Sequence, residues 1–167
     1  YKEKNRAQLS DKYNSAIIEF NSLDKQKTIF SMKEIVESKD STYSPLALYF
    51  LLDNNLIDDR NEINNLFDTV INKTSLEYEI KNLIIYKKAM YNADMAKENE
   101  LLNILNPILK SKSLWKSHAL LLMADYFEHN NKLVKSKDFL EEIINSETVN
   151  SEIRIEAERR LKRKFGD

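Results

Sequence analysis

The residues best suited to chemistry in this sequence are two histidines and an aspartate in its C-terminal half. His118 and Asp125 are seven residues apart, and Asp125 and His129 are four apart, so a helix would place all three on one face. A closed metal site needs further ligands from another element, and the chain has only 2 histidines and no cysteine. We therefore expect no bound metal, and solvated or helix-capping roles for these three side chains.

Other patterns that could indicate catalysis are weak. The acidic pairs at positions 58–59 and 141–142 are adjacent in sequence, so their carboxylates point in different directions and do not form a catalytic pair. The sequence also lacks the G-x-S-x-G and H-E-x-x-H patterns of hydrolases and zinc proteases. We predict that the protein is not an enzyme and uses no cofactor. An enzyme whose site is assembled only by folding stays open as an alternative.

Composition limits the fold that could position these residues. The chain has 167 residues, one glycine, two prolines and no cysteine, with a formal net charge of −1. One glycine argues against folds that need glycine in tight turns or phosphate-binding loops, and the small charge gives no general attraction for nucleic acid. The longest apolar runs are far shorter than the roughly 20 residues that a membrane span requires. We predict an all-α fold in a single domain, residues 1–167.

Apolar residues recur at helical spacing along nine segments that are separated by polar breaks. Asn130-Asn131 is typical of a left-handed turn, and Pro107 should end or kink the sixth helix. The helix starts are predicted from residues that can cap free backbone amides, namely Asp24, Ser44, Asp59, Thr74, Ser113 and Ser151. The nine expected helices cover about residues 6–23, 24–37, 44–55, 59–71, 75–92, 98–107, 113–129, 132–144 and 151–165.

Helical hairpins at intervals of roughly 30 to 45 residues indicate a solenoid, in which each pair buries a face against the next. The segment 117–148 resembles a tetratricopeptide repeat, with Met123-Ala124 as the large and small pair of the first helix and Ser136 as the small residue of the second. Ala47, Ala89 and Ala124 repeat the small position at intervals of 42 and 35 residues. We expect a tetratricopeptide-like α-solenoid of about nine antiparallel helices with a C-terminal capping helix.

Four segments carry a resemblance to a particular family: residues 43–48, 101–109 with its proline, 114–124 and 153–161. Across Tyr13 to Leu161 the chain resembles the tetratricopeptide-like domain of the ancillary subunits of the Sec translocon. That resemblance implies an N-terminal membrane anchor, a location on the periplasmic side of a bacterial inner membrane, and partners among translocon subunits and periplasmic chaperones. It implies no catalytic residues. The start at Tyr1 instead of methionine fits an upstream segment that is missing from this sequence.

A protein-binding groove is expected on the concave face that the first helices of successive hairpins form. Tyrosine and methionine would supply adaptable apolar contacts, and the acids would orient a basic or amide-bearing peptide. These acids argue against capture of a terminal carboxylate, which requires cationic or amide side chains. The leucines have an equal alternative, since they could fill the space between hairpins. The expected groove residues are Leu48, Leu51, Tyr86, Met90, Leu121, Asp125 and Glu128.

The C-terminal segment 154–164 is rich in arginine and lysine, but glutamates interleave with the cations. We expect a solvated terminal helix there and no nucleic-acid site, because cations near a helix C-terminus also complement the helix dipole. The partners would be proteins or peptides. Self-assembly through the first or last hairpin is the alternative from another functional class.

Overall fold

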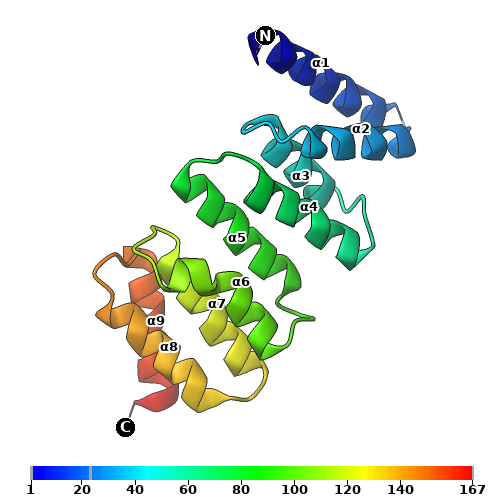
Figure 1. Cartoon of the computed structure of the whole chain (residues 1–167). Coiled ribbons are helices and arrows are strands. Elements are labelled where there is room, and N and C mark those ends of the chain that lie inside the picture. The colour runs from blue at the N-terminus through cyan, green and yellow to red at the C-terminus, as the bar shows by residue number, and fades with distance from the viewer. Residues whose placement is uncertain (1, 23, 167) are drawn as a thin grey trace. The chain divides into compact units, whose positions relative to one another are not determined.

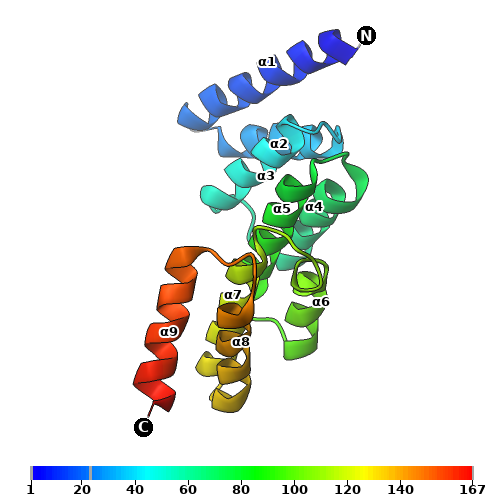
Figure 2. The same ribbon diagram turned by 90° about the vertical axis from the view of Figure 1, so that its left-hand side faces the viewer.

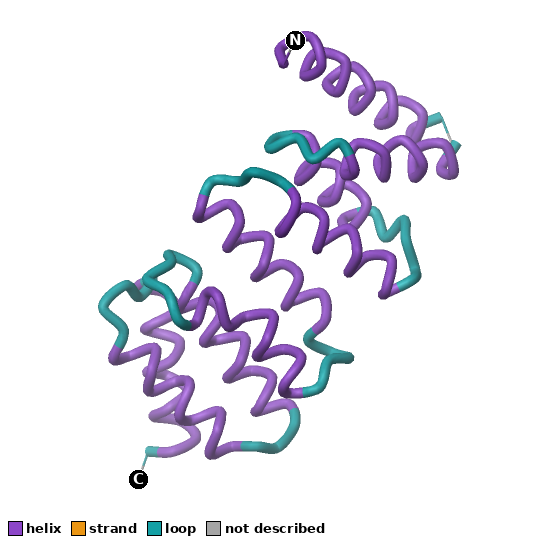
Figure 3. The backbone as a smooth tube through the Cα atoms, in the orientation of Figure 1, coloured by secondary structure: helices purple, strands orange, loops and turns teal. Residues whose placement is uncertain are grey.

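The computed structural model describes residues 2–22 and 24–166, in which the chain forms nine helices and no strand (Figure 1; Figure 3). The all-α prediction is therefore confirmed. The chain divides into two compact units, Tyr1–Glu77 and Tyr78–Asp167. The expectation of a single domain over residues 1–167 stays a prediction. No helix in the described ranges combines the length and the hydrophobicity needed to cross a membrane.

The first unit is built around its second helix, which contacts the other three. Met32 and Ile35 of that helix are fully buried together with Leu48, Leu51 and Phe67. Burying each of these side chains contributes about 2 kcal/mol, so this apolar core is what holds the unit together. The helices are α1 (Lys2–Asn21), α2 (Lys25–Glu37), α3 (Tyr43–Asp53) and α4 (Arg60–Lys73).

The second unit is built around its third helix, α7, which contacts α5, α6, α8 and α9. Figure 2 shows α7 and α8 next to each other, with α9 alongside. One core cluster joins the last three helices and consists of Leu120, Ala124, Leu140, Ile143, Ile153 and Ala157. The helices are α5 (Tyr78–Asn92), α6 (Glu98–Leu109), α7 (Lys116–His129), α8 (Leu133–Asn145) and α9 (Ser151–Phe165).

Two hairpins, α1–α2 and α7–α8, are closed by the same kind of buried hydrogen bond. In α1–α2 the Thr28 hydroxyl donates to the Ala16 carbonyl oxygen at 3.0 Å, and in α7–α8 the Ser136 hydroxyl donates to the Ala124 carbonyl oxygen at 2.8 Å. Both pairs are twelve residues apart and buried. A side chain larger than alanine would separate the helices, so the alanine allows the close approach that the hydroxyl bond then fixes.

Two of the predicted helix caps are confirmed. Asp24 accepts a hydrogen bond from the backbone amide of Lys27 at 3.2 Å, and Asp59 accepts one from the amide of Asn61 at 2.8 Å. The predicted left-handed turn is also present, because Asn131 has a φ of 58°. Asparagine tolerates this conformation better than most residues, which explains how a chain with one glycine makes the turn.

Three other predicted caps are wrong. Asp40 takes the place of Ser44 before α3, accepting from the amide of Tyr43 at 2.8 Å, while the Ser44 hydroxyl donates to the Ile35 carbonyl. Thr74 ends α4 instead of starting α5. Asn150 caps α9 one residue before Ser151. A short polar side chain near a helix start has several backbone partners within reach, so sequence alone does not choose among neighbouring candidates.

The remaining two helix signals are confirmed in part. Ser113 lies three residues before α7, where its hydroxyl oxygen accepts from the amide of Trp115 at 3.1 Å and its proton goes to Glu79 of α5 at 2.7 Å. Ser113 therefore ties the start of α7 to α5. Pro107 lies inside α6, and the helix ends two residues later at Leu109.

Candidate functional site

The two groove residues expected in the first unit do not lie on its surface. Leu48 and Leu51 of α3 are both fully buried. An apolar side chain without exposed area contacts no partner unless the unit opens. The alternative interpretation, in which these leucines fill the core, therefore describes their positions, and the groove prediction is corrected for both.

Tyr86 lies in an aromatic cluster between α5 and α7. Its ring stacks on Trp115 with centroids 5.9 Å apart, and His118 meets both rings at 5.8 Å and 4.8 Å. Burial raises the pKa of the Tyr86 hydroxyl, and the negative charge of Asp125 raises it further. Burial also lowers the pKa of His118. Tyr86 is therefore half-buried in this cluster, and part of its side chain is accessible.

Met90 continues the Tyr86 stripe along α5. It lies one turn further on, and 43% of its surface is exposed. Asp94 lies another four residues along, just beyond the end of α5, and its side chain is exposed. The stripe thus passes from a half-buried aromatic ring through an exposed thioether to an exposed carboxylate.

A matching stripe on α7 consists of His118, Leu122, Asp125 and His129, spaced four, three and four residues apart. The two stripes meet at a pocket of about 250 Å³ lined by Ala93, Asp94, Leu122, Asp125, Tyr126 and His129. We call the surface formed by Tyr86, Met90, Asp94, His118, Leu122, Asp125 and His129 the α5–α7 face.

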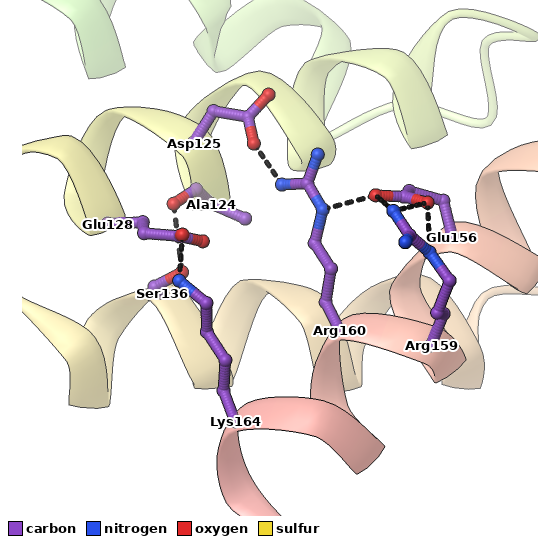
Figure 4. A network of polar contacts seen from close by, with 8 residues as sticks. All are labelled: Ala124, Asp125, Glu128, Ser136, Glu156, Arg159, Arg160 and Lys164. Atoms are coloured by element: carbon purple, nitrogen blue, oxygen red, sulfur yellow. Dashed lines mark hydrogen bonds and ion pairs between the residues drawn. The ribbon is translucent and has the colours of Figure 1, made fainter.

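The other side of α7 is occupied by α9. Arg160 of α9 pairs with Asp125, and Lys164 pairs with Glu128 (Figure 4). The guanidinium of Arg160 lies between Asp125 and Glu156, to which its Nε donates at 2.6 Å. Glu128 is therefore engaged with α9, while Asp125 stands between α9 and the α5–α7 face.

Hydrogen bonds from Arg160 and Arg159 hold the pKa of Glu156 below its ordinary value. Arg159 donates to the two Glu156 oxygens at 2.9 Å and 2.8 Å. Three of the basic residues that the sequence analysis expected to be solvated, Arg159, Arg160 and Lys164, therefore form the ion-pair network drawn in Figure 4, and Arg160 and Lys164 attach α9 to α7. Exposed ion pairs contribute little to the free energy of unfolding. The network is therefore described for the position that it gives α9 on α7.

Leu121 is partly buried and does not line this pocket. It packs against the core cluster of α7, α8 and α9, whereas its neighbour Leu122 lines the pocket. One residue along a helix turns the side chain by about 100°, so a register error of one exchanges a residue packed against the core cluster for one that lines the pocket. Leu121 therefore lies beside the core, close to its alternative interpretation, and keeps part of its surface exposed.

A second, more open pocket of about 530 Å³ lies between α7 and α9. It is lined by Asp125, Glu128, His129, Glu156, Arg159, Arg160 and Arg163. The pocket brings His129 near acids of another helix, as an enzyme with a dispersed site would require. His129 is exposed, however, and within the described ranges no hydrogen bond joins it to a carboxylate.

The arrangement of histidines and acids bears on metal binding. Over residues 2–22 and 24–166, no three histidine or acidic side chains are grouped closely enough to hold a metal ion. His118 packs against Tyr86 and Trp115, and His129 lies at the exposed end of α7. The three residues that the sequence singled out thus share a helix face without forming a chelating group.

Sequence reasoning missed four residues of the pocket: Ala93, Asp94, Leu122 and Tyr126. The signal for Leu122 was present, because it completes the helical stripe of His118, Asp125 and His129. Tyr126 is held by a hydrogen bond from its hydroxyl to the Ala96 carbonyl at 2.9 Å. Neither this bond nor the approach of Asp94 is encoded in local spacing, since both depend on how the loop after α5 reaches α7.

Comparison of the chain with models of protein families, with curated proteins and with solved structures finds no match in any of the three.

Proposed function

We propose that the chain has a tetratricopeptide-like repeat fold. In the second unit, α7 packs on α5 and α9 packs on α7, while each of α6 and α8 packs on the helices before and after it. This alternation of first helix on first helix is the pattern of stacked hairpins. The buried Ala16–Thr28 and Ala124–Ser136 bonds support it, because two hairpins far apart in sequence use the same closing contact.

We infer that the second unit is a non-enzymatic module that binds a protein or peptide through its α5–α7 face. The observation that carries the proposal is the order of the features along this face. The half-buried Tyr86 ring is followed by the exposed Met90 and then by the pocket at Asp125. Tyrosine and methionine are enriched where proteins bind one another, since they bury much apolar area and adapt to their partner. A preformed helical face also binds with little ordering cost.

The family resemblance refines this proposal. In a membrane-anchored form of the protein on the periplasmic side of a bacterial inner membrane, the partners would be Sec translocon subunits and periplasmic chaperones. This part of the proposal rests on residues 43–48, 101–109, 114–124 and 153–161. It predicts a defined set of partners, so it is tested separately from the binding face.

The test is quantitative capture by the anchored full-length protein from gently solubilised native membranes, read by mass spectrometry. Met90→Lys places a charge on the α5–α7 face, and Val134→Lys is the matched control on α8, where Val134 is 74% exposed. We expect Met90→Lys to reduce the captured partner by about fivefold or more and Val134→Lys to leave it unchanged. Equal capture by both variants would contradict binding at the α5–α7 face. A set of captured partners without translocon subunits or chaperones would contradict the role that the family resemblance implies.

Self-assembly is a second candidate, and exposed apolar residues of the first hairpin favour it. Ile18 of α1 is 67% exposed and Phe30 of α2 is 64% exposed. Side chains of this kind on a terminal hairpin could pack against a second copy of the chain. The molecular mass measured over a range of concentrations separates the candidates, because self-assembly raises the mass with concentration. An Ile18→Lys variant that abolishes the rise would place the contact on this hairpin.

A further inference from the structure

The pocket at the end of the α5–α7 face has rigid apolar walls. Ala93, Leu122 and Tyr126 are among the residues that line its volume of about 250 Å³. The Tyr126 ring is fixed at one end by its hydroxyl bond to the Ala96 carbonyl and packs edge-on against Phe127, with centroids 5.6 Å apart. The pocket therefore exists before any ligand arrives, and it suits a narrow apolar group.

Two carboxylates border these walls. Asp94 is exposed and makes no ion pair with any residue in the described ranges. Asp125 pairs with Arg160 through its Oδ1 atom only, which leaves its second oxygen for another donor. The lining contains no lysine or arginine. A ligand group bound here would therefore contact both apolar side chains and carboxylates.

This combination matches the side chains that carry a cation on an aliphatic stem. Lysine and arginine bury their methylene groups against apolar surface while the charged end reaches a polar partner. Arginine fits better than lysine, because its planar guanidinium can donate to two carboxylates at once. The chain itself offers a precedent, since Arg160 of α9 already places a guanidinium against the other side of Asp125.

We infer that this pocket binds an arginine side chain of the partner peptide, with its stem against Leu122 and Tyr126 and its guanidinium between Asp94 and Asp125. The inference rests on the proposed function, since it names what the α5–α7 face recognises. The neighbouring Met90 and Tyr86 would contact the residues that flank this arginine in the peptide. The partner's recognised segment is thus basic at one position and apolar beside it.

The test is a nuclear magnetic resonance titration of the ¹⁵N-labelled 167-residue chain with the capped tripeptide acetyl-Ala-Arg-Ala-amide. The matched probe replaces arginine by citrulline, which has nearly the same shape and no charge. We expect shifts of amide signals in residues 93–96 and 122–129, with the citrulline peptide binding about fivefold more weakly. A free polyamine such as spermidine serves as a third probe, and stronger binding of spermidine than of the arginine peptide would contradict a peptide ligand.

Asp94→Asn tests the contact from the side of the protein. It should weaken the arginine peptide about fivefold and leave the citrulline peptide unchanged. Asp138→Asn on α8 is the control, because it makes the same exchange at another exposed aspartate of the second unit. Both variants change exposed residues, and the unchanged positions of distant amide signals will show that they fold.

Equal binding of the arginine and citrulline peptides would overturn the inference. So would shifts confined to other residues, no shift at millimolar peptide, or full binding by Asp94→Asn. These results would leave the proposed function standing if Met90→Lys still reduced partner capture. Conversely, the arginine peptide could bind at the pocket while Met90→Lys leaves partner capture unchanged. The pocket would then bind arginine, but the α5–α7 face would not bind the partner.

Discussion

The hairpins α1–α2 and α7–α8 share one closing contact but differ in their surroundings. Each has a buried alanine in its first helix and a hydroxyl twelve residues later that donates to the alanine carbonyl. In α7–α8 the first helix carries two acids that pair with α9. In α1–α2, Ile18 of the first helix and Phe30 of the second are exposed. The geometry of a hairpin and the chemistry of its outer face are therefore set by different residues.

This separation explains how degenerate repeats can keep one fold. The buried pair occupies the line where the two helices are closest, and only small or hydroxyl side chains fit there. The outer positions have no such constraint, so one hairpin can bind α9 while the other presents apolar side chains. The following variants test whether the closing contact contributes equally to the stability of the two hairpins. They also test whether the hairpins differ only at residues outside that contact.

The largest effect is expected from filling the closing contact. Ala16→Leu and Ala124→Leu each insert a large side chain where the alanine is buried, and each should lower the free energy of unfolding by about 3 kcal/mol. Urea unfolding followed by circular dichroism measures this loss. Ala7→Leu is the control, because Ala7 of α1 is exposed. A loss in only one of the two hairpins would break their equivalence.

Removing the hydroxyl bonds should have a smaller effect. Thr28→Val and Ser136→Ala each delete one buried hydrogen bond, at a cost of about 1 kcal/mol. Thr28→Ser keeps the hydroxyl and should recover part of the loss, whereas Thr148→Val at an exposed position should change little. The same urea experiment applies. If Thr28→Val and Thr148→Val were equally stable, the closing bond would have no energetic role.

A pH-dependent effect is expected only for the hairpin that carries α9. The pKa of Glu156 lies below its ordinary 4.5 because Arg160 and Arg159 donate to the charged form. Its contribution to stability is therefore present above pH 4.5 and is lost as the pH falls through the lowered pKa. Glu156→Gln should be slightly less stable than the wild type at pH 7 and equally stable once Glu156 is protonated.

The single tryptophan, Trp115, lies in the second unit and reports its unfolding by fluorescence. Urea midpoints measured with this signal from pH 7 to pH 3 would show the convergence of Glu156→Gln and wild type. Glu142→Gln on α8 is the control, since Glu142 is exposed. A stability difference that stays constant over the whole pH range would contradict a role for the charged Glu156.

The smallest effects concern the left-handed residues. Lys39 and Asn131 have φ values of 57° and 58°, a conformation that costs a lysine more than an asparagine. Lys39→Gly should raise the free energy of unfolding by about 0.5 kcal/mol after the entropy that glycine adds to the unfolded chain. Asn131→Gly should change the free energy of unfolding by no more than about 0.3 kcal/mol. Thermal unfolding would rank the two, and a larger gain at Asn131 would contradict the ranking.

Much of the fold could be predicted from the sequence, because helix formation leaves a strong periodic signal. Asp24, Asp59 and Asn131 were identified as cap or turn residues, and their backbone bonds and φ angle confirm them. Ser44 and Thr74 were not caps, since their hydroxyls donate to carbonyls of Ile35 and Thr69 instead. Those alternatives depend on packing that sequence spacing does not show.

The candidate site was harder to predict, and the misses have a common cause. Leu48 and Leu51, expected on the surface, are fully buried, and Leu121 is partly buried against the core cluster. Tyr86, Met90 and Asp125 do lie on the α5–α7 face. For Tyr86 and Asp125 a hydroxyl or a carboxylate restricts the face on which the side chain can lie, whereas leucine carries no polar group that would mark its direction. Met90 lacks such a group too, so this signal does not explain its exposed position. The ion pairs with α9 join residues about 35 positions apart and leave no local signal.

Site-specific photo-crosslinking in cells that make the full-length protein tests the binding face most directly. A photoreactive phenylalanine analogue would replace Met90 in one variant and Val134 in the other. A protein partner bound to the α5–α7 face predicts a discrete crosslinked product from position 90 and none from position 134. Crosslinks from position 134 alone, from both positions equally, or from neither would contradict binding at this face.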